Sequence, residues 1–193
     1  MKLRSASPVL VLVFLAAVST AFAHPGHGFS SGFGAGLTHP LGGWDHLLAL
    51  LAIGIWATQL GGRATWWVPG IFVGVMALAA VAGRHFGAWA VFDQGAAASV
   101  VALGLLIGAA VRLPLVAGAA LAAAFAVFHG YTHGAESAAG QDFLTYGIGF
   151  VLTSAGLHLA GIGLGRGAAH LSANSTRLLG WGVTAAGLVA LAT

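Results

Sequence analysis

The stretch that decides the fold reads LVAGAALAAAFAVF over residues 115–128 and continues as HGYTH to residue 133. It holds no charged or hydrogen-bonding side chain before His129. A helix that crosses a bilayer needs about 17–25 predominantly apolar residues. The segment 114–133 is therefore predicted to span a membrane as a helix.

The same composition extends over the whole chain. Of its 193 residues, 59% are hydrophobic and 6% are charged, whereas a soluble domain carries about 25% charged residues. The apolar stretches predict six spans, at residues 36–58, 66–83, 95–111, 114–133, 143–164 and 176–192. Short hydrophilic breaks separate them, such as residues 61–63 and 166–177. The fold class predicted is an all-α, polytopic membrane bundle, with residues 24–193 as one six-helix transmembrane domain.

The first 23 residues have the three parts of a cleavable signal peptide. Lys2 and Arg4 form the positive n-region, residues 9–18 the apolar h-region, and Ala21-Phe22-Ala23 the small-residue cleavage site. Cleavage would make His24 the mature N-terminus, outside the cytoplasm. The alternative is an uncleaved first membrane helix, which the short apolar run disfavours.

The basic residues give an independent prediction of the orientation. If residue 24 begins outside, the breaks between spans alternate between inside and outside. Four arginines then fall inside and one outside: Arg63, Arg112, Arg166 and Arg177 against Arg84. This satisfies the positive-inside rule and predicts a multi-pass protein of the bacterial inner membrane with both mature termini in the periplasm.

Composition also excludes several classes of function. The sequence has no cysteine, so disulfides, thiolate zinc sites and iron–sulfur clusters are excluded, and two methionines are too few for a soft Cu(I) path. The computed pI is about 10.2, but the basic residues are scattered singly, so no nucleic-acid partner is predicted.

Glycine is frequent and recurs in steps of four residues, a spacing that lets membrane helices approach closely. The pairs are Gly32/Gly36, Gly70/Gly74, Gly104/Gly108, Gly130/Gly134 and Gly161/Gly165. They predict tight helix packing and offer faces through which a homo-oligomer could form.

Ionisable residues inside a membrane are costly and usually functional, and here they gather in two motifs. His39-Pro40-Leu41-Gly42-Gly43-Trp44-Asp45-His46 opens the first predicted span, and Phe128-His129-Gly130-Tyr131-Thr132-His133-Gly134-Ala135-Glu136 closes the fourth. On a helix, residues three or four apart share one face, so His129, His133 and Glu136 can hold one ion. Imidazole and carboxylate ligands suit Ni(II), Co(II) or Zn(II). The predicted topology brings both motifs into the outer half of the membrane.

His39 and His46 would lie about 10 Å apart along a straight helix, too far to share an ion. Pro40, Gly42 and Gly43 stand between them and are residues that break or kink helices. Either the segment is kinked, which brings His39 back, or the two histidines serve successive sites. We favour the kink.

The remaining histidines are weaker candidates. His24 and His27 could capture metal beside the new α-amino group or belong to a disordered tail. His158, alone in the fifth span, either satisfies a hydrogen bond or marks an exit-side site nearer the cytoplasm. His85 and His170 fall in breaks and are expected to be solvated.

At the two motifs the sequence resembles the HupE/UreJ family of bacterial nickel and cobalt permeases. His39, Asp45 and His46 match the family's His-x5-Asp-His segment, and a second group matches its Phe-His-Gly-x-x-His-Gly-x-Glu segment: His129, His133 and Glu136. The resemblance implies uptake of Ni(II) or Co(II) without an ATPase, with the ion as cargo and no prosthetic group.

Two other functions compete with a permease. An intramembrane zinc-dependent hydrolase would use the histidines as ligands and Asp45 or Glu136 as general base. A membrane-anchored metal sensor is the third hypothesis, although the sequence shows no soluble output domain. For a permease, metal binding is expected to weaken below about pH 6.5, because neutral imidazole is the ligand form.

Overall fold

The computed structural model describes residues 32–137 and 142–192. The expected signal peptide, residues 1–23, and the candidate ligands His24 and His27 lie outside the described residues.

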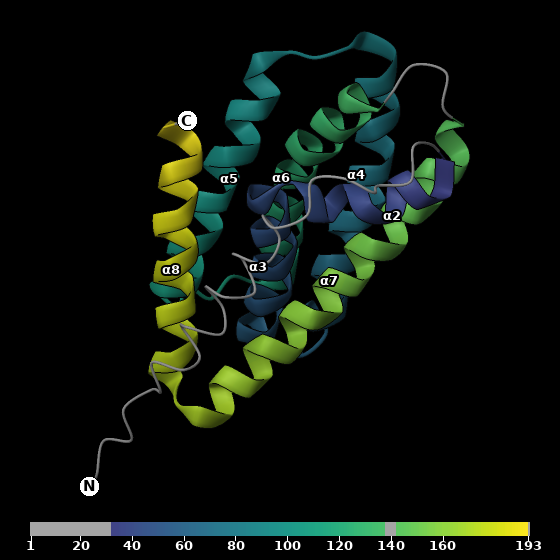
Figure 1. Ribbon diagram of the computed structural model, residues 1–193. Coiled ribbons are helices and arrows are strands. Elements are labelled where there is room, and N and C mark those ends of the chain that lie inside the picture. The colour runs from purple at the N-terminus through teal and green to yellow at the C-terminus, as the bar shows by residue number, and fades with distance from the viewer. Residues whose placement is uncertain (1–31, 138–141, 193) are drawn as a thin grey trace, which may run out of the picture.

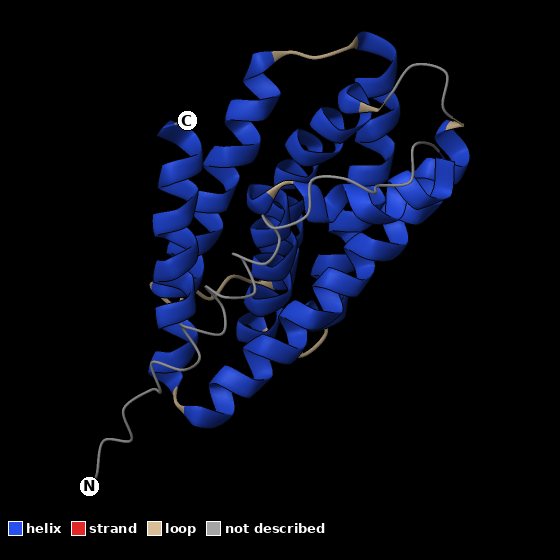
Figure 2. Cartoon of the chain, viewed as in Figure 1, coloured by secondary structure: helices blue, strands red, loops and turns tan. Residues whose placement is uncertain are grey.

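Seven helices make up nearly all of the described chain, and no strand occurs in it (Figure 2). They are α2 Gly32–Gly42, α3 Trp44–Leu60, α4 Ala64–Phe86, α5 Ala90–Gly108, α6 Leu115–Glu136, α7 Phe143–Leu171 and α8 Ala173–Ala192. Five of them are long and apolar enough to cross a membrane, and a sixth span results if α2 and α3 are taken together. The prediction of an all-α membrane bundle is confirmed.

The first predicted span is not one continuous helix. α2 and α3 meet at an angle of 82°, so α2 lies across the bundle while α3 runs along it (Figure 1). Gly43 joins them with an extended backbone (φ −107°, ψ 121°), directly after a second glycine. Glycine is a poor helix former, and the missing N–H of Pro40 weakens the preceding turn. The first predicted span, 36–58, corresponds to this bent pair of helices, and the predicted kink is confirmed.

The fifth predicted span is too short. α7 continues to Leu171, so most of the break expected at residues 166–177 is helical and only Ser172 separates α7 from α8. Alanine, arginine and leucine in residues 166–171 favour a helix even where the hydropathy falls.

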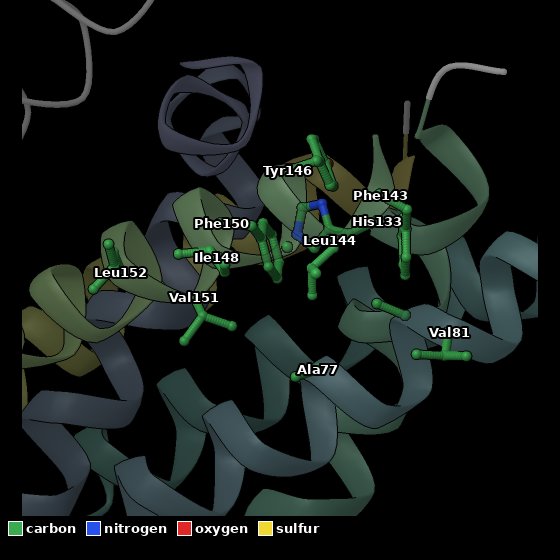
Figure 3. A pocket seen from close by; sticks show the side chains of 12 residues that line it. Ala77, Val81, His133, Phe143, Leu144, Tyr146, Ile148, Phe150, Val151 and Leu152 are labelled. Atoms are coloured by element: carbon green, nitrogen blue, oxygen red, sulfur yellow. The ribbon is translucent and has the colours of Figure 1, made fainter. Parts of the chain in front are cut away.

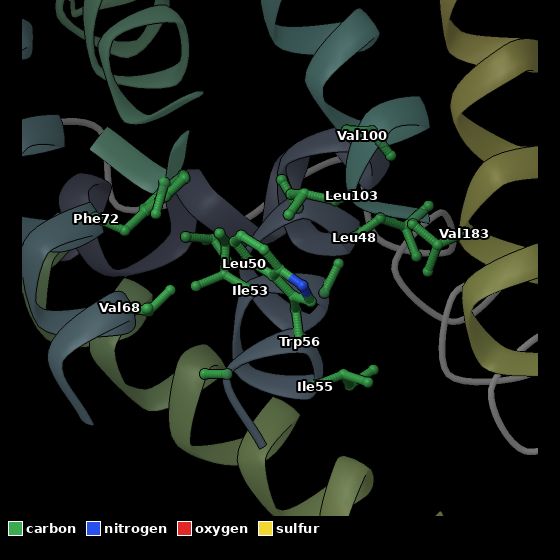
Figure 4. Packing of buried hydrophobic residues seen from close by; sticks show 14 of the residues in the cluster. Leu48, Leu50, Ile53, Ile55, Trp56, Val68, Phe72, Val100, Leu103 and Val183 are labelled. Atoms are coloured by element: carbon green, nitrogen blue, oxygen red, sulfur yellow. The ribbon is translucent and has the colours of Figure 1, made fainter. Parts of the chain in front are cut away.

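α3 is the central helix of the bundle. It packs against all six other described helices, and its residues from His46 to Ala57 are buried except Leu51, which is partly buried. Its apolar side chains, among them Leu48, Ile53 and Trp56, face neighbours on every side (Figure 4). A helix that is hydrophobic all round is expected to be buried in this way.

Glycines allow several pairs of helices to pack backbone to backbone. A Cβ at Gly130 or Gly134 would overlap a carbonyl oxygen of α4, and one at Gly161 would overlap the carbonyl oxygen of Leu51 in α3. The predicted pair Gly70/Gly74 behaves differently, because no atom lies within 4 Å of a Cβ built at either position. That pair therefore faces outward and takes no part in packing within the bundle.

The two ends of the bundle differ in charge. At one end the guanidinium of Arg166 lies 5.7 Å from the ring centre of Trp66, and Arg177 donates a hydrogen bond of 3.0 Å to the carbonyl of Gly108. We call this the basic end, since the turns beside it also carry Arg63 and Arg112. The opposite, acidic end holds Asp93 in the first turn of α5, Glu136 closing α6, and Asp142 capping α7.

Candidate metal centre

The bend at Gly43 brings both ends of the first motif against the end of α6. The ring of His133 has its centre 4.8 Å from that of His39, on α2, and 4.0 Å from that of His46, on α3. The ring of His46 in turn lies 5.4 Å from that of His129. The four imidazoles therefore form one chain of contacts, in the order His39, His133, His46, His129.

Three side chains converge on one point at the acidic end. Nε2 of His39 lies 2.8 Å from Nδ1 of His133 and 3.1 Å from Oε2 of Glu136, and the last two atoms are 3.6 Å apart. Metal–ligand bonds of about 2.1 Å place neighbouring ligands about 3.0 Å apart in octahedral and about 3.4 Å apart in tetrahedral geometry. The group His39, His133 and Glu136, here the outer triad, thus has ligand separations that fit one transition-metal ion.

The three side chains of the outer triad differ in their exposure to solvent. The side chain of Glu136 is 49% exposed, that of His39 27% and that of His133 3%. A hydrated cation arriving at the acidic end would meet the carboxylate first and the buried imidazole last.

Asp45 lies outside the outer triad and orients His46. Its Oδ1 is 2.9 Å from Nδ1 of His46, and since a carboxylate only accepts, Nδ1 carries the proton. The lone pair of His46 is then on Nε2, which is buried without a hydrogen-bond partner. A carboxylate behind a histidine whose other nitrogen is free is the usual arrangement of a metal-binding histidine.

His129 lies one helical turn deeper than His133 and is held from a third helix. Its Nε2 is 2.7 Å from the hydroxyl of Ser99, which is also 2.7 Å from the carbonyl of Ala96. Both contacts are satisfied when Ser99 donates to the carbonyl and His129 donates to Ser99, which leaves the lone pair of His129 on Nδ1. The sequence predicted that His129, His133 and Glu136 share one site. In the structure His133 and Glu136 lie together with His39 instead, and His129 is outside this outer triad.

Several neighbours of these histidines carry no signal in the sequence. Ser99 is one small polar residue in an apolar helix, and Tyr146 and Phe150 are two aromatic residues among many, yet both rings contact His39. Thr132 donates a hydrogen bond of 2.9 Å to Asp93, which ties the second motif to the start of α5. Only the packing of α5 and α7 against α6 and α2 identifies them.

An apolar cavity of about 420 Å³ reaches the site from the side of the bundle. It lies between α4 and α7, and Figure 3 shows the imidazole of His133 beside Tyr146, Phe150 and Leu144. Its outer rim is formed by exposed side chains such as Val81 and Leu152. On this side, the surroundings of His133 are thus mainly apolar.

The remaining predicted histidines lie away from the outer triad. His85 and His170 are exposed, in the last turns of α4 and α7. His158 is 2% exposed and lies at the midpoint of α7, because that helix is longer than predicted.

Comparison with known proteins gives a consistent assignment. The sequence profile of the family described as HupE / UreJ protein matches residues 12–190. Protein HupE of Rhizobium leguminosarum bv. viciae is 41% identical over 153 residues, which cover 79% of this chain and 80% of that protein. No solved structure matches.

Proposed function

The chain belongs to the HupE/UreJ family, and from that premise we propose that it is an inner-membrane permease for uptake of a divalent transition-metal ion, Ni(II) or Co(II). The observation that carries the proposal is the outer triad, whose three ligand atoms lie within 4.8 Å of one another at the acidic end. In this proposal the acidic end faces the periplasm, the signal peptide is removed, and the ion is cargo rather than a resident group.

The proposed metal ligands are the residues of the two motifs, each with its own task. Glu136 and His39 receive the hydrated ion, and His133 replaces further water. His46 and His129 continue the chain of imidazoles inward, with Asp45 holding His46 in its ligand tautomer. The partly buried carboxylate supplies charge, since transfer of a dication out of water is costly without it.

Neutral imidazoles and one carboxylate form a borderline-hard set that suits Ni(II) and Co(II). Zn(II) accepts the same ligands, so the choice among the three ions depends on the geometry of the loaded site and on metal supply.

The second candidate, an intramembrane zinc-dependent hydrolase, is favoured by the apolar cavity that reaches His133 from the side. Such a cavity could admit a lipid or peptide to a bound metal. The buried Nε2 of His158 has no hydrogen-bond partner and lies outside both motifs, which favours the permease, because a hydrolase has no use for a further free ligand beyond its metal.

Metal uptake by cells tests the proposal directly. Cells that express the protein are expected to accumulate Ni(II) or Co(II) above the level of cells carrying an empty vector, measured by mass spectrometry. A proton uncoupler separates passive entry, which persists, from proton-coupled entry, which stops. Equal metal content in both strains for Ni(II), Co(II) and Zn(II) would rule out the permease.

Asp45→Asn tests the orienting role of the carboxylate. Asparagine keeps the size of the side chain but loses the charge that favours the proton on Nδ1 of His46, so we expect metal affinity to fall about 10–100-fold. Titration of the purified protein with Co(II) measures this. Asp142→Asn is the matched control, since Asp142 caps α7 by accepting from the N–H of Leu144 and belongs to neither motif. An unchanged affinity in D45N would show that the carboxylate has no part in binding.

A further inference from the structure

We infer that His158 is a second metal-binding station, in the middle of the bundle, to which the ion passes from the histidines of the two motifs. The inference rests on the proposed permease function and extends it inward, where neither motif contributes a residue.

The hydrogen bond of His158 fixes which nitrogen can bind a metal. Nδ1 lies 2.7 Å from the carbonyl oxygen of Leu50, and since a carbonyl only accepts, the proton is on Nδ1. The lone pair is then on Nε2, which is buried and has no hydrogen-bond partner. This is the tautomer of a metal-binding histidine, with a backbone carbonyl as the orienting group.

Two further polar atoms without partners lie one helical turn toward the acidic end. On α3, His46 precedes Leu50 by four residues, and its Nε2 is also unpartnered. On α7, Ser154 precedes His158 by four residues, and its hydroxyl is fully buried and unpartnered. Buried polar groups normally find partners, so an unsatisfied group in the interior calls for an explanation. A passing ion would offer each of these three atoms a partner in turn.

The outer triad and His158 are connected along one face of α7. Tyr146, Phe150, Ser154 and His158 follow one another at intervals of four residues and are all buried. The first two contact His39, and Phe150 also contacts His133, with ring centres 4.6 Å apart. Four residues correspond to about 6 Å of helix, so His158 lies about 6 Å deeper than Ser154.

The ring of Phe72, on α4, lies against both His129 of the second motif and His158. Its ring centre lies 5.8 Å from that of His129 and 5.3 Å from that of His158, and its side chain is fully buried. An aromatic ring between two ligand levels keeps an ion at one of them until the side chain moves.

The outer triad and the proposed station at His158 differ in charge in a way that suits onward movement of the ion. The outer triad includes a carboxylate, whereas His158 and Ser154 are neutral and offer weaker binding. Conduction requires sites that attract the ion without retaining it.

Transport by purified protein in liposomes tests the station. Co(II) is added outside and its entry is followed by quenching of trapped calcein, for the wild type and for His158→Asn. Asparagine can still donate an N–H to the carbonyl of Leu50 but lacks the Nε2 lone pair. We expect Co(II) affinity at the outer triad to stay within twofold and entry to slow at least tenfold. His170→Asn, the same change at an exposed position of α7, is expected to transport at the wild-type rate.

The outcomes distinguish this inference from the proposed function. Absence of Co(II) entry in the wild type would overturn the permease itself. Entry at the wild-type rate in H158N would reduce His158 to a core hydrogen bond. If H158N does not fold, the wild type labelled with ¹⁵N-histidine is titrated with Cd(II). We expect the unprotonated Nε2 resonance of His158 to shift, and an unmoved resonance at saturation would overturn the station.

Discussion

Cells that express His133→Ala are expected to accumulate no more Ni(II) or Co(II) than cells without the protein. His133 is the buried proposed ligand of the outer triad, and its ring also connects His39 with His46. Its loss leaves His39 and the half-exposed Glu136, two ligands that water can replace. Loss of an orienting partner of a ligand already costs about 10–100-fold in affinity, and loss of the ligand should cost more.

The control for this variant is His85→Ala. His85 is exposed in the last turn of α4 and is not among the candidate ligands, so H85A should take up metal at the wild-type rate. Both variants are compared at equal amounts in the membrane fraction, and Co(II) titration of the purified proteins separates loss of binding from loss of transport.

We also expect His129→Ala to abolish uptake. Wild-type uptake in both H133A and H129A would contradict the proposed site.

Gly83→Val is expected to prevent the bundle from assembling, the second large effect. A Cβ at Gly83 would overlap the carbonyl oxygen of Tyr131, and its next neighbours are backbone atoms of the same helix, α6. Backbone cannot rotate away as a side chain can, so α4 and α6 would have to separate. Overpacking of a core costs roughly 1–3 kcal/mol, and overlap with backbone belongs at or above the upper limit. We expect the folded yield, measured by size-exclusion chromatography in detergent, to fall below a tenth of the wild type.

Gly74→Val is the matched control on the same helix. No atom lies within 4 Å of a Cβ built at Gly74, so the valine side chain would point away from the other described helices. The two variants differ in contact but not in the chemistry of the substitution, and G74V should elute as the wild type does. A normal yield of G83V would show that α4 and α6 are not packed as described.

The sequence was sufficient to predict an all-α membrane bundle, because hydropathy shows directly whether a helix is surrounded by water or by apolar groups. The apolar stretches gave α4, α5, α6 and α8 close to their observed bounds. The prediction failed at the end of α7, which continues past Arg166, whereas the first span is the bent pair α2 and α3, as the favoured kink predicts. Hydropathy could not find the end of α7, because it measures how apolar a segment is, whereas arginine and alanine favour a helix in polar segments as well.

The sequence also named the residues of the candidate site, since ionisable groups inside an apolar chain are conspicuous. The sequence could not show which of these residues lie together in space. Spacing along α6 paired His129 with His133, which is correct for one helix, but His39 joins the outer triad only because α2 turns by 82° and packs across α7. That packing depends on Gly36 and Gly149, where each helix lies against the backbone of the other.

The sequence by itself determined that this protein is a helical membrane bundle carrying costly polar residues in two motifs, because burial of apolar surface depends on composition. The tertiary structure decided which of those residues lie within ligand distance of one another, which nitrogen of His46 and of His158 is free, and that His158 lies at the middle of α7. These facts depend on the crossing of helices distant in sequence, and no local pattern encodes a crossing.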